Sequence, residues 1–120
     1  PVQIDQMALP PCYLYFQFFV EGEHLNMFAL QRSGDLFLGV PYDMALFTMI
    51  LNHVAEATGL KPNKVKMNIV DAHIYDNATE QVKTYLDRPI QCSPTYTFEN
   101  NQVKLHNYKC GAPIKCSVAV

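Results

Sequence analysis

The apolar pattern at the start of the chain predicts a β-hairpin. Residues 14–20 are mostly aromatic or β-branched, and residues 24–33 follow with a partial alternation that includes Leu25 and Met27. Runs of these residue types favour strands, and the Glu-Gly-Glu at 21–23 is typical of a turn. We therefore expect two strands that pair with each other.

After Pro41 the spacing of apolar side chains changes from that of a strand to that of a helix. The recurring positions are Met44, Phe47, Ile50, Leu51, Val54 and Thr58. Their spacing of three and four residues predicts a helix, and Gly59 lies where a glycine commonly ends one. Because few polar residues interrupt this segment, we expect the helix to be buried on most sides.

The middle of the chain predicts a strand followed by a short helix. Lys-Pro-Asn at 61–63 is typical of a turn, and residues 65–70 alternate as a strand does. Asn77, followed three residues later by Glu80, resembles a capping box, which opens a helix. We expect that helix to end before Pro89.

The remaining residues predict a second hairpin. Its strands are residues 95–98 and 103–108, joined by a turn at 99–102. The whole pattern is ββ-α-β-α-ββ. We expect a single domain over residues 1–120, of the α+β class, with helices packed against a mixed or antiparallel sheet.

The composition is that of a globular domain with few charges. Of the 120 residues, 49% are apolar and 17% are charged, whereas about 25% are charged in typical domains. This excludes an intrinsically disordered chain and suggests that another chain covers part of the apolar surface. The net charge of −2 argues against non-specific binding to nucleic acid, so we expect no such partner.

The sequence carries no sign of a membrane span or of a secretion signal. The longest apolar stretch, residues 8–20, contains two prolines and Gln17, and it is shorter than the roughly 18 residues that a span needs. The start lacks the basic and apolar sections of a signal peptide. We expect no membrane partner, a cytoplasmic protein and, because Pro1 stands where Met would, a start that has been cut or processed.

The four cysteines lack the spacing of a disulfide framework or of a metal site. There is no Cys-x-x-Cys pair, and His106, Cys110 and Cys116 are spaced more widely than the ligands of structural zinc sites. We therefore expect free thiols in a reducing compartment and no bound metal.

Three groups of polar residues at strand ends are candidates for chemistry. Cys12 follows a Pro-Pro step and is either a thiolate nucleophile or a buried thiol that packs as a small hydrophobe. Arg32 is suited to binding phosphate or to stabilising a facing thiolate, and the alternative is a solvated turn. His73 and Tyr75 alternate onto one face, with a core histidine as the alternative.

Five motifs, in this order, resemble those of the thymidylate synthase family. They are Leu-Pro-Pro-Cys at 9–12, Gln-Arg-Ser-x-Asp at 31–35, Phe-Leu-Gly-x-Pro at 37–41, Asp-Ala-His-Ile-Tyr at 71–75 and Pro-Ile-Lys at 113–115. The resemblance runs nearly the whole length of the chain and covers the C-terminal half of a full family member. It implies a thymidylate-synthase-like α+β fold and a folate-dependent transfer of one carbon to C5 of a pyrimidine deoxynucleotide.

The resemblance also implies roles for the residues that hold the nucleotide. Cys12 would be the nucleophile that attacks C6 of the base. Arg32 would lie beside the thiolate and the 5′-phosphate, which Ser33 also binds. Gln31 would help to order the nucleotide, and the backbone N–H of Asp35 would bind O2 of the base.

The remaining implied roles concern the ribose and the folate. His73 and Tyr75 would hydrogen-bond the ribose 3′-hydroxyl. 5,10-Methylenetetrahydrofolate is the implied co-substrate and one-carbon donor. Its implied contacts are the Asp35 carboxylate on the pterin ring, Leu38, Gly39 and Tyr42 along the folate, and Ala119 and Val120 as a closing lid.

Two positions depart from the family pattern. Asp43 stands where the family carries the Asn that reads the uracil edge, and Tyr13 replaces the His after the nucleophile. An ionised Asp only accepts hydrogen bonds, whereas a protonated or proton-sharing Asp donates to cytosine N3 and accepts from the 4-amino group. The presence of Asp at this position resembles the deoxycytidylate methylases and hydroxymethylases of the family. We expect it to act in catalysis and to favour dCMP over dUMP, with the methyl and hydroxymethyl products both open.

Alternative functions stay open beside this one. The chain is otherwise a thymidylate synthase acting on dUMP, a non-catalytic nucleotide-binding or dimerising half-domain, or a structural remnant in which Cys12 is merely buried. The family's further phosphate-binding arginines and its water-organising acidic residue are absent from these 120 residues. We therefore expect a homodimer or an association with a separate N-terminal half, and slow turnover or none by the chain alone.

Overall fold

The computed structural model describes residues 3–90, 92–99 and 102–119. It divides into two compact units, which we call the first unit (Pro1–Tyr75) and the second unit (Asp76–Val120). Five strands and two helices follow the order β-β-α-β-α-β-β within the described residues. This order confirms the α+β class and the predicted succession of elements.

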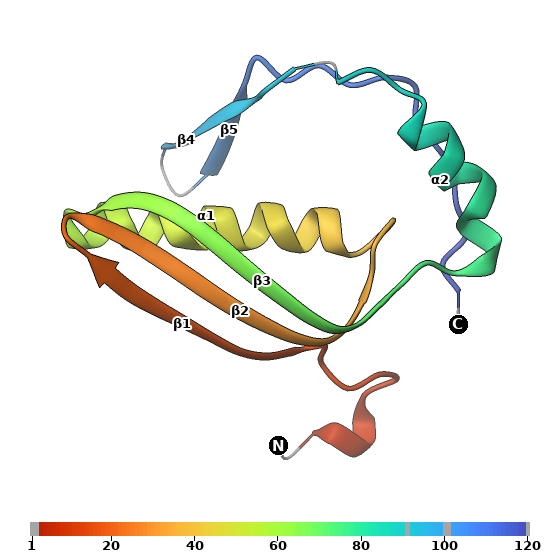
Figure 1. Cartoon of the computed structure of the whole chain (residues 1–120), viewed down its shortest axis with the longest axis horizontal. Helices are drawn as coiled ribbons and strands as arrows, with labels where there is room; N and C mark the ends of the chain where they lie inside the picture. Colours follow the sequence, from red (N-terminus) through yellow and green to blue (C-terminus); the bar gives the residue numbers. More distant parts are fainter. Residues whose placement is uncertain (1–2, 91, 100–101, 120) are drawn as a thin grey trace. The chain divides into compact units, whose positions relative to one another are not determined.

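The first unit is a three-stranded mixed sheet with one helix lying along it (Figure 1). β1 (Tyr13–Glu21) pairs antiparallel with β2 (His24–Asp35), which confirms the first hairpin, and β2 pairs in parallel with β3 (Lys61–His73). α1 (Val40–Thr58) is the crossover connection that a parallel pair of strands requires. A 3₁₀ turn, η1 (Ile4–Gln6), precedes the sheet.

The core of the first unit lies between β2 and one side of α1. Alternate side chains of β2, Leu25 and Ala29 among them, face Phe47, Leu51 and Ala55 of the helix, and all of these are at most 4% exposed. The partly buried residues around them are Phe18, Ile50, Val54, Leu60, Val65 and Met67. This packing fixes α1 against the strands whose ends carry the candidate site residues.

The prediction that α1 is buried on most sides is wrong. Only four of its 19 residues are buried, and Tyr42 and Met44 are 78% and 57% exposed. A sheet of three strands covers one stripe of the helix, so the rest of its apolar surface has no cover within the first unit. The sequence pattern shows what a helix is able to bury, and the surrounding chain decides how much of it is covered.

β3 begins four residues earlier than predicted. Lys61 and Pro62 pair with the first two residues of β2, so the prediction of a turn at 61–63 is wrong. The backbone N–H of Lys61 donates to the carbonyl oxygen of Glu23 (2.9 Å), and its ammonium lies 2.8 Å from the carboxylate of the same residue. The chain turns earlier, at Gly59, whose φ of 69° ends α1 as predicted. Proline is tolerated near the start of an edge strand.

The second unit contains α2 (Thr79–Leu86) and a hairpin of β4 (Thr95–Glu99) and β5 (Gln102–His106). The short helix and the second hairpin are therefore confirmed. Strand β5 ends two residues earlier than predicted because the residue after His106 has a left-handed backbone (φ 56°), which breaks the extended conformation. The two central residues of the predicted turn, 100 and 101, lie outside the described residues.

The predicted capping box at the start of α2 is wrong. A 3₁₀ turn, η2 (Asp76–Ala78), precedes the helix, and the N-cap Ala78 offers no side-chain hydrogen bond. The Asn77 amide donates instead to the carbonyl oxygen of Ser117 (3.0 Å) and so ties the helix start to the C-terminal segment. In the described part of the chain, no helix combines the length and the apolarity that crossing a membrane requires.

Candidate functional site

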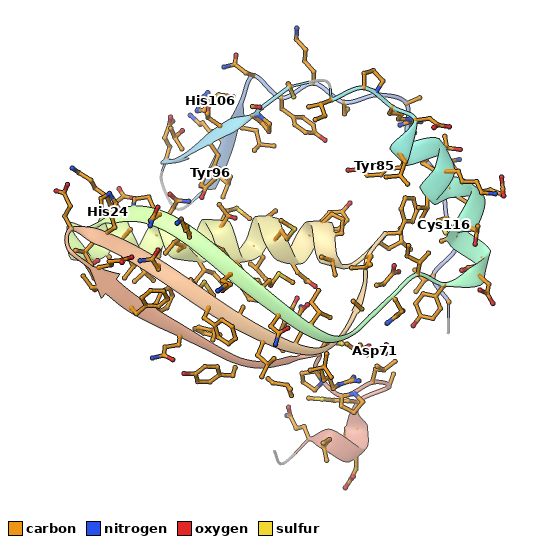
Figure 2. The ribbon with its side chains drawn as sticks, in the orientation of Figure 1. His24, Asp71, Tyr85, Tyr96, His106 and Cys116 are labelled. Atoms are coloured by element: carbon orange, nitrogen blue, oxygen red, sulfur yellow. The ribbon has the colours of Figure 1, made fainter. Side chains whose placement is uncertain are left out.

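The three polar groups singled out in the sequence meet at one end of the first unit's sheet. Because β1 runs antiparallel to β2 and β3 runs parallel to it, the start of β1 lies beside the ends of β2 and β3. Tyr13 pairs with Gln31, and Asp35 pairs with His73. Figure 2 shows Asp71 at this end of the sheet and His24 at the opposite end.

Arg32 holds the segment that leads to Cys12. Its guanidinium donates to the carbonyl oxygens of Pro10 (2.7 Å) and Pro11 (3.1 Å), and its backbone N–H donates to the carbonyl oxygen of Cys12 (2.9 Å). The thiol is free and half-buried. The Arg32 charge is thus fixed next to the residues that precede the thiol, and a direct pair of guanidinium and thiolate stays a prediction.

Asp43 accepts a hydrogen bond at each of its two carboxylate oxygens. Tyr13 Oη donates to Oδ1 (2.5 Å), and Gln31 Nε2 donates to Oδ2 (2.8 Å). The residue lies in the first turn of α1, where the helix dipole favours a negative charge. Gln31 is fully buried, and among the described residues no donor reaches its Oε1. Asp43 therefore joins α1 to β1 and β2 by accepting one hydrogen bond from each strand.

Tyr13 stays protonated well above neutral pH. The hydrogen bond to Asp43 is the main cause that raises the pKa of Tyr13 to about 12, followed by burial and by the charges of Asp43 and Cys12. Sequence reasoning assigned Tyr13 no partner. Its position next to Cys12 places it near the candidate nucleophile, but that position does not predict a hydrogen bond to a residue of α1.

The loop between β2 and α1 is folded around the Asp35 carboxylate. Asp35 Oδ1 accepts from the backbone N–H groups of Phe37 (2.9 Å) and Leu38 (3.3 Å), and its carbonyl oxygen accepts from Gly39 N (3.1 Å). A Cβ at Gly39 would lie 3.3 Å from that carbonyl oxygen. The turn places Leu38, Gly39 and the exposed Tyr42 beside the end of β2, where the resemblance puts the folate.

Asp71 joins two of the predicted ligand-binding residues. Ser33 Oγ donates to Asp71 Oδ2 (3.2 Å), and His73 Nδ1 lies 3.4 Å from the same oxygen and 3.2 Å from the Asp71 carbonyl oxygen. The His73 and Tyr75 rings meet edge to face with centroids 4.9 Å apart. Sequence reasoning gave Asp71 no role of its own, because only the pairing of β2 with β3 brings it to Ser33.

The predicted lid falls in the second unit. Ala119 is half-buried there, and Val120 lies outside the described residues. Its closure over a folate stays a prediction. Among the described residues, no group of three or more His, Cys, Asp or Glu side chains gathers in a way that would hold a metal ion.

A thiol, a guanidinium and three carboxylates lie at one end of this sheet, and such groups are typical of sites for nucleophilic chemistry on anionic substrates. The model of the thymidylate synthase family matches residues 1–120, so the chain belongs to that family. Over 129 aligned residues it is 37% identical to the thymidylate synthase of Mycoplasma pneumoniae (strain ATCC 29342 / M129 / Subtype 1). That alignment covers 100% of this chain and 45% of the relative, so the chain spans about half the relative's length.

Proposed function

We propose that this chain supplies the nucleophile and much of the nucleotide site of a folate-dependent pyrimidine deoxynucleotide C5 methyl- or hydroxymethyltransferase. The observation that carries the proposal is the position of Cys12. Arg32 holds the two residues before it, and Asp43 holds the residue after it. Family membership over the whole chain supports the same reaction class.

The chemistry assigned to Cys12 is addition of its thiolate to C6 of the base. The addition moves an electron pair toward C5, which then forms a bond to the one-carbon unit. Loss of the C5 proton and cleavage of the bond between the one-carbon unit and the folate nitrogen then leave an exocyclic methylene at C5, with tetrahydrofolate as the leaving group. The co-substrate 5,10-methylenetetrahydrofolate supplies the one-carbon unit. Hydride transfer from tetrahydrofolate to the methylene gives a methyl product and dihydrofolate, whereas addition of water gives a hydroxymethyl product and leaves tetrahydrofolate. In both cases the thiolate leaves C6, and the double bond between C5 and C6 is restored.

The residues around Cys12 are assigned to binding by their charge and position. Arg32 and Ser33 bind the 5′-phosphate, Gln31 orders the nucleotide, and His73 and Tyr75 bind the ribose. Asp71 supports this assignment, because it orients Ser33 and His73 together. The folate is assigned to Asp35, Leu38, Gly39 and Tyr42, and the lid role of Ala119 and Val120 stays a prediction.

Asp43 is assigned to base selection, with dCMP favoured over dUMP. Both of its carboxylate oxygens act as acceptors. An acceptor suits the 4-amino group of cytosine and opposes O4 of uracil. A site whose polar groups mismatch a ligand rejects it by as much as roughly 10⁴-fold.

The catalytic unit is proposed to contain a second chain, either another copy or a separate N-terminal half. Tyr15 and Phe19 of β1 are each 48% exposed, and one side of α1 is also exposed. Exposed apolar surface of this kind is typical of an interface with another chain. We place the protein in the cytoplasm, which the four free cysteines support.

Release of tritium from C5 tests the proposed reaction. The protein is combined with a complementing N-terminal half of a family member, methylenetetrahydrofolate and either dCMP or dUMP labelled at C5. Release that is faster with dCMP, and absent in Cys12→Ala, is the expected result. Release that persists in Cys12→Ala contradicts the nucleophile. Nucleotide binding without any release favours the second candidate, a non-catalytic nucleotide-binding half-domain.

A further inference from the structure

We infer that Tyr13 is a positioning residue that sets the base selectivity of Asp43, by holding its carboxylate in one orientation together with Gln31. This inference rests on the proposed function, since it concerns the group that faces the base. It joins the two positions at which the chain departs from the family pattern, because the two side chains are bonded to each other.

The three hydrogen-bonded residues Tyr13, Gln31 and Asp43 come from three elements that the core of the first unit holds together. Tyr13 comes from β1, Gln31 from β2 and Asp43 from α1. The Tyr13 ring packs edge to face on Phe47, with centroids 5.6 Å apart, and Phe47 is 4% exposed. The strand register shifts between Tyr13 and Tyr15. Register shifts of the β-bulge type re-aim side chains beside functional sites.

Two bonds restrict a carboxylate more than one does. With Tyr13 Oη on Oδ1 and Gln31 Nε2 on Oδ2, rotation of the carboxylate breaks at least one bond to a fixed donor. The oxygens therefore keep their direction when O4 of uracil approaches. Without the hydroxyl, Asp43 is able to turn aside or admit a bridging water, and the penalty against uracil falls.

A tyrosine performs this task over a wide pH range. The titratable groups that face Tyr13 are Asp43 from α1 and Cys12, which directly precedes β1, and the facing residue of β2 is the neutral Gln31. The pKa of Tyr13 is about 12, so the phenol keeps its proton throughout the neutral range. The imidazole of a histidine changes charge near pH 6.5, so it would make selectivity pH-dependent.

The test is the ratio of two dissociation constants, those for dUMP and dCMP, measured by titration calorimetry on the full chain combined with the complementing N-terminal half. Tyr13→Phe removes the hydroxyl and keeps the ring on Phe47. We expect the ratio to fall about tenfold, the order expected for one charge-assisted hydrogen bond. Tyr15→Phe is the matched control, because it removes a hydroxyl of the same strand that donates to Gln17 instead (2.6 Å). It should leave the ratio unchanged.

Two further variants separate positioning from folding. In an Asp43→Asn background, Tyr13→Phe should change the ratio by less than about threefold, since the charge-assisted bond is already gone. Tyr13→His should give a ratio that varies between pH 5.5 and 8, whereas the unchanged protein gives a constant one.

The outcomes distinguish the two proposals. An equal loss of affinity for both nucleotides in Tyr13→Phe, or an unchanged ratio, overturns the role of Tyr13 and leaves the proposed function standing. Tighter binding of dUMP than of dCMP by the unchanged protein refutes the base assignment. Binding of neither nucleotide refutes both.

Discussion

Among the glycines, Gly34 has the least room for an added Cβ, and it lies behind the site. It lies in β2 between two candidate ligand-binding residues, and a Cβ added there would stand 2.9 Å from Val40 Cγ2 and 3.2 Å from Ile69 Cγ2. Val40 is the first residue of α1 and is 8% exposed, so it has little room to move. Gly34→Ala therefore forces the start of the helix away from the sheet.

The cost follows from two opposing terms. Overpacking of a core costs roughly 1–3 kcal/mol. Alanine at position 34 also lowers the conformational entropy of the unfolded chain, which stabilises the fold by about 0.4–1 kcal/mol. We expect Gly34→Ala to lower the free energy of unfolding by about 1–2 kcal/mol. For a chain of this size that lowers Tm by ~4–8 °C. Urea titration and thermal melting, both followed by far-UV circular dichroism, measure the two quantities.

A second variant tests the cause. Val40→Ala removes the methyl group that lies nearest, and adding Gly34→Ala in that background should cost less than about 0.5 kcal/mol. A Gly34→Ala chain as stable as the unchanged one would refute the packing account. So would an equal cost in both backgrounds.

Two other predictions concern the polar groups of the site. Because the pKa of Tyr13 is raised from 10 to about 12, its bond to Asp43 stabilises the fold fully below pH 10, and this stabilisation is lost as the pH rises toward 12. Absorbance at 295 nm is titrated for the unchanged protein and for Tyr13→Phe, and the difference should show one tyrosine that titrates near pH 12. A difference that titrates near pH 10 would contradict the prediction. Asp71→Asn should weaken dCMP binding by roughly threefold to tenfold, because Ser33 and His73 lose the charged acceptor that they share. It should barely change Tm, because the Asp71 side chain is 69% exposed. An unchanged dissociation constant would remove Asp71 from the site.

The elements that the sequence predicted well are those with a local cause. The period of Phe47, Leu51 and their neighbours, followed by a glycine able to adopt a left-handed backbone, determines α1 almost to the residue. The early start of β3 at Lys61 and Pro62 was not predictable in this way. Its cause is the parallel pairing with β2, which joins residues far apart in the chain.

The candidate site was predictable as a list of residues and not as an arrangement. Family motifs pointed to Cys12, Arg32 and His73, and the sheet brings their strand ends together. The bond from Tyr13 to Asp43 joins residues 30 positions apart and exists because Phe47 seats the tyrosine ring against α1. The failed capping box has the same explanation, since a distant carbonyl oxygen engages Asn77.

The central claim is that Cys12 is an activated nucleophile inside a nucleotide site, and competitive alkylation tests it most directly. The chain is treated with limiting iodoacetamide at neutral pH, with and without dCMP, and mass spectrometry gives the rate at each cysteine. Exposure alone would make Cys110 react first, because it is exposed while the other three thiols are half-buried. We predict that Cys12 reacts fastest and that dCMP protects it alone. Equal rates at all four cysteines, or no protection of Cys12 by the nucleotide, would contradict the claim.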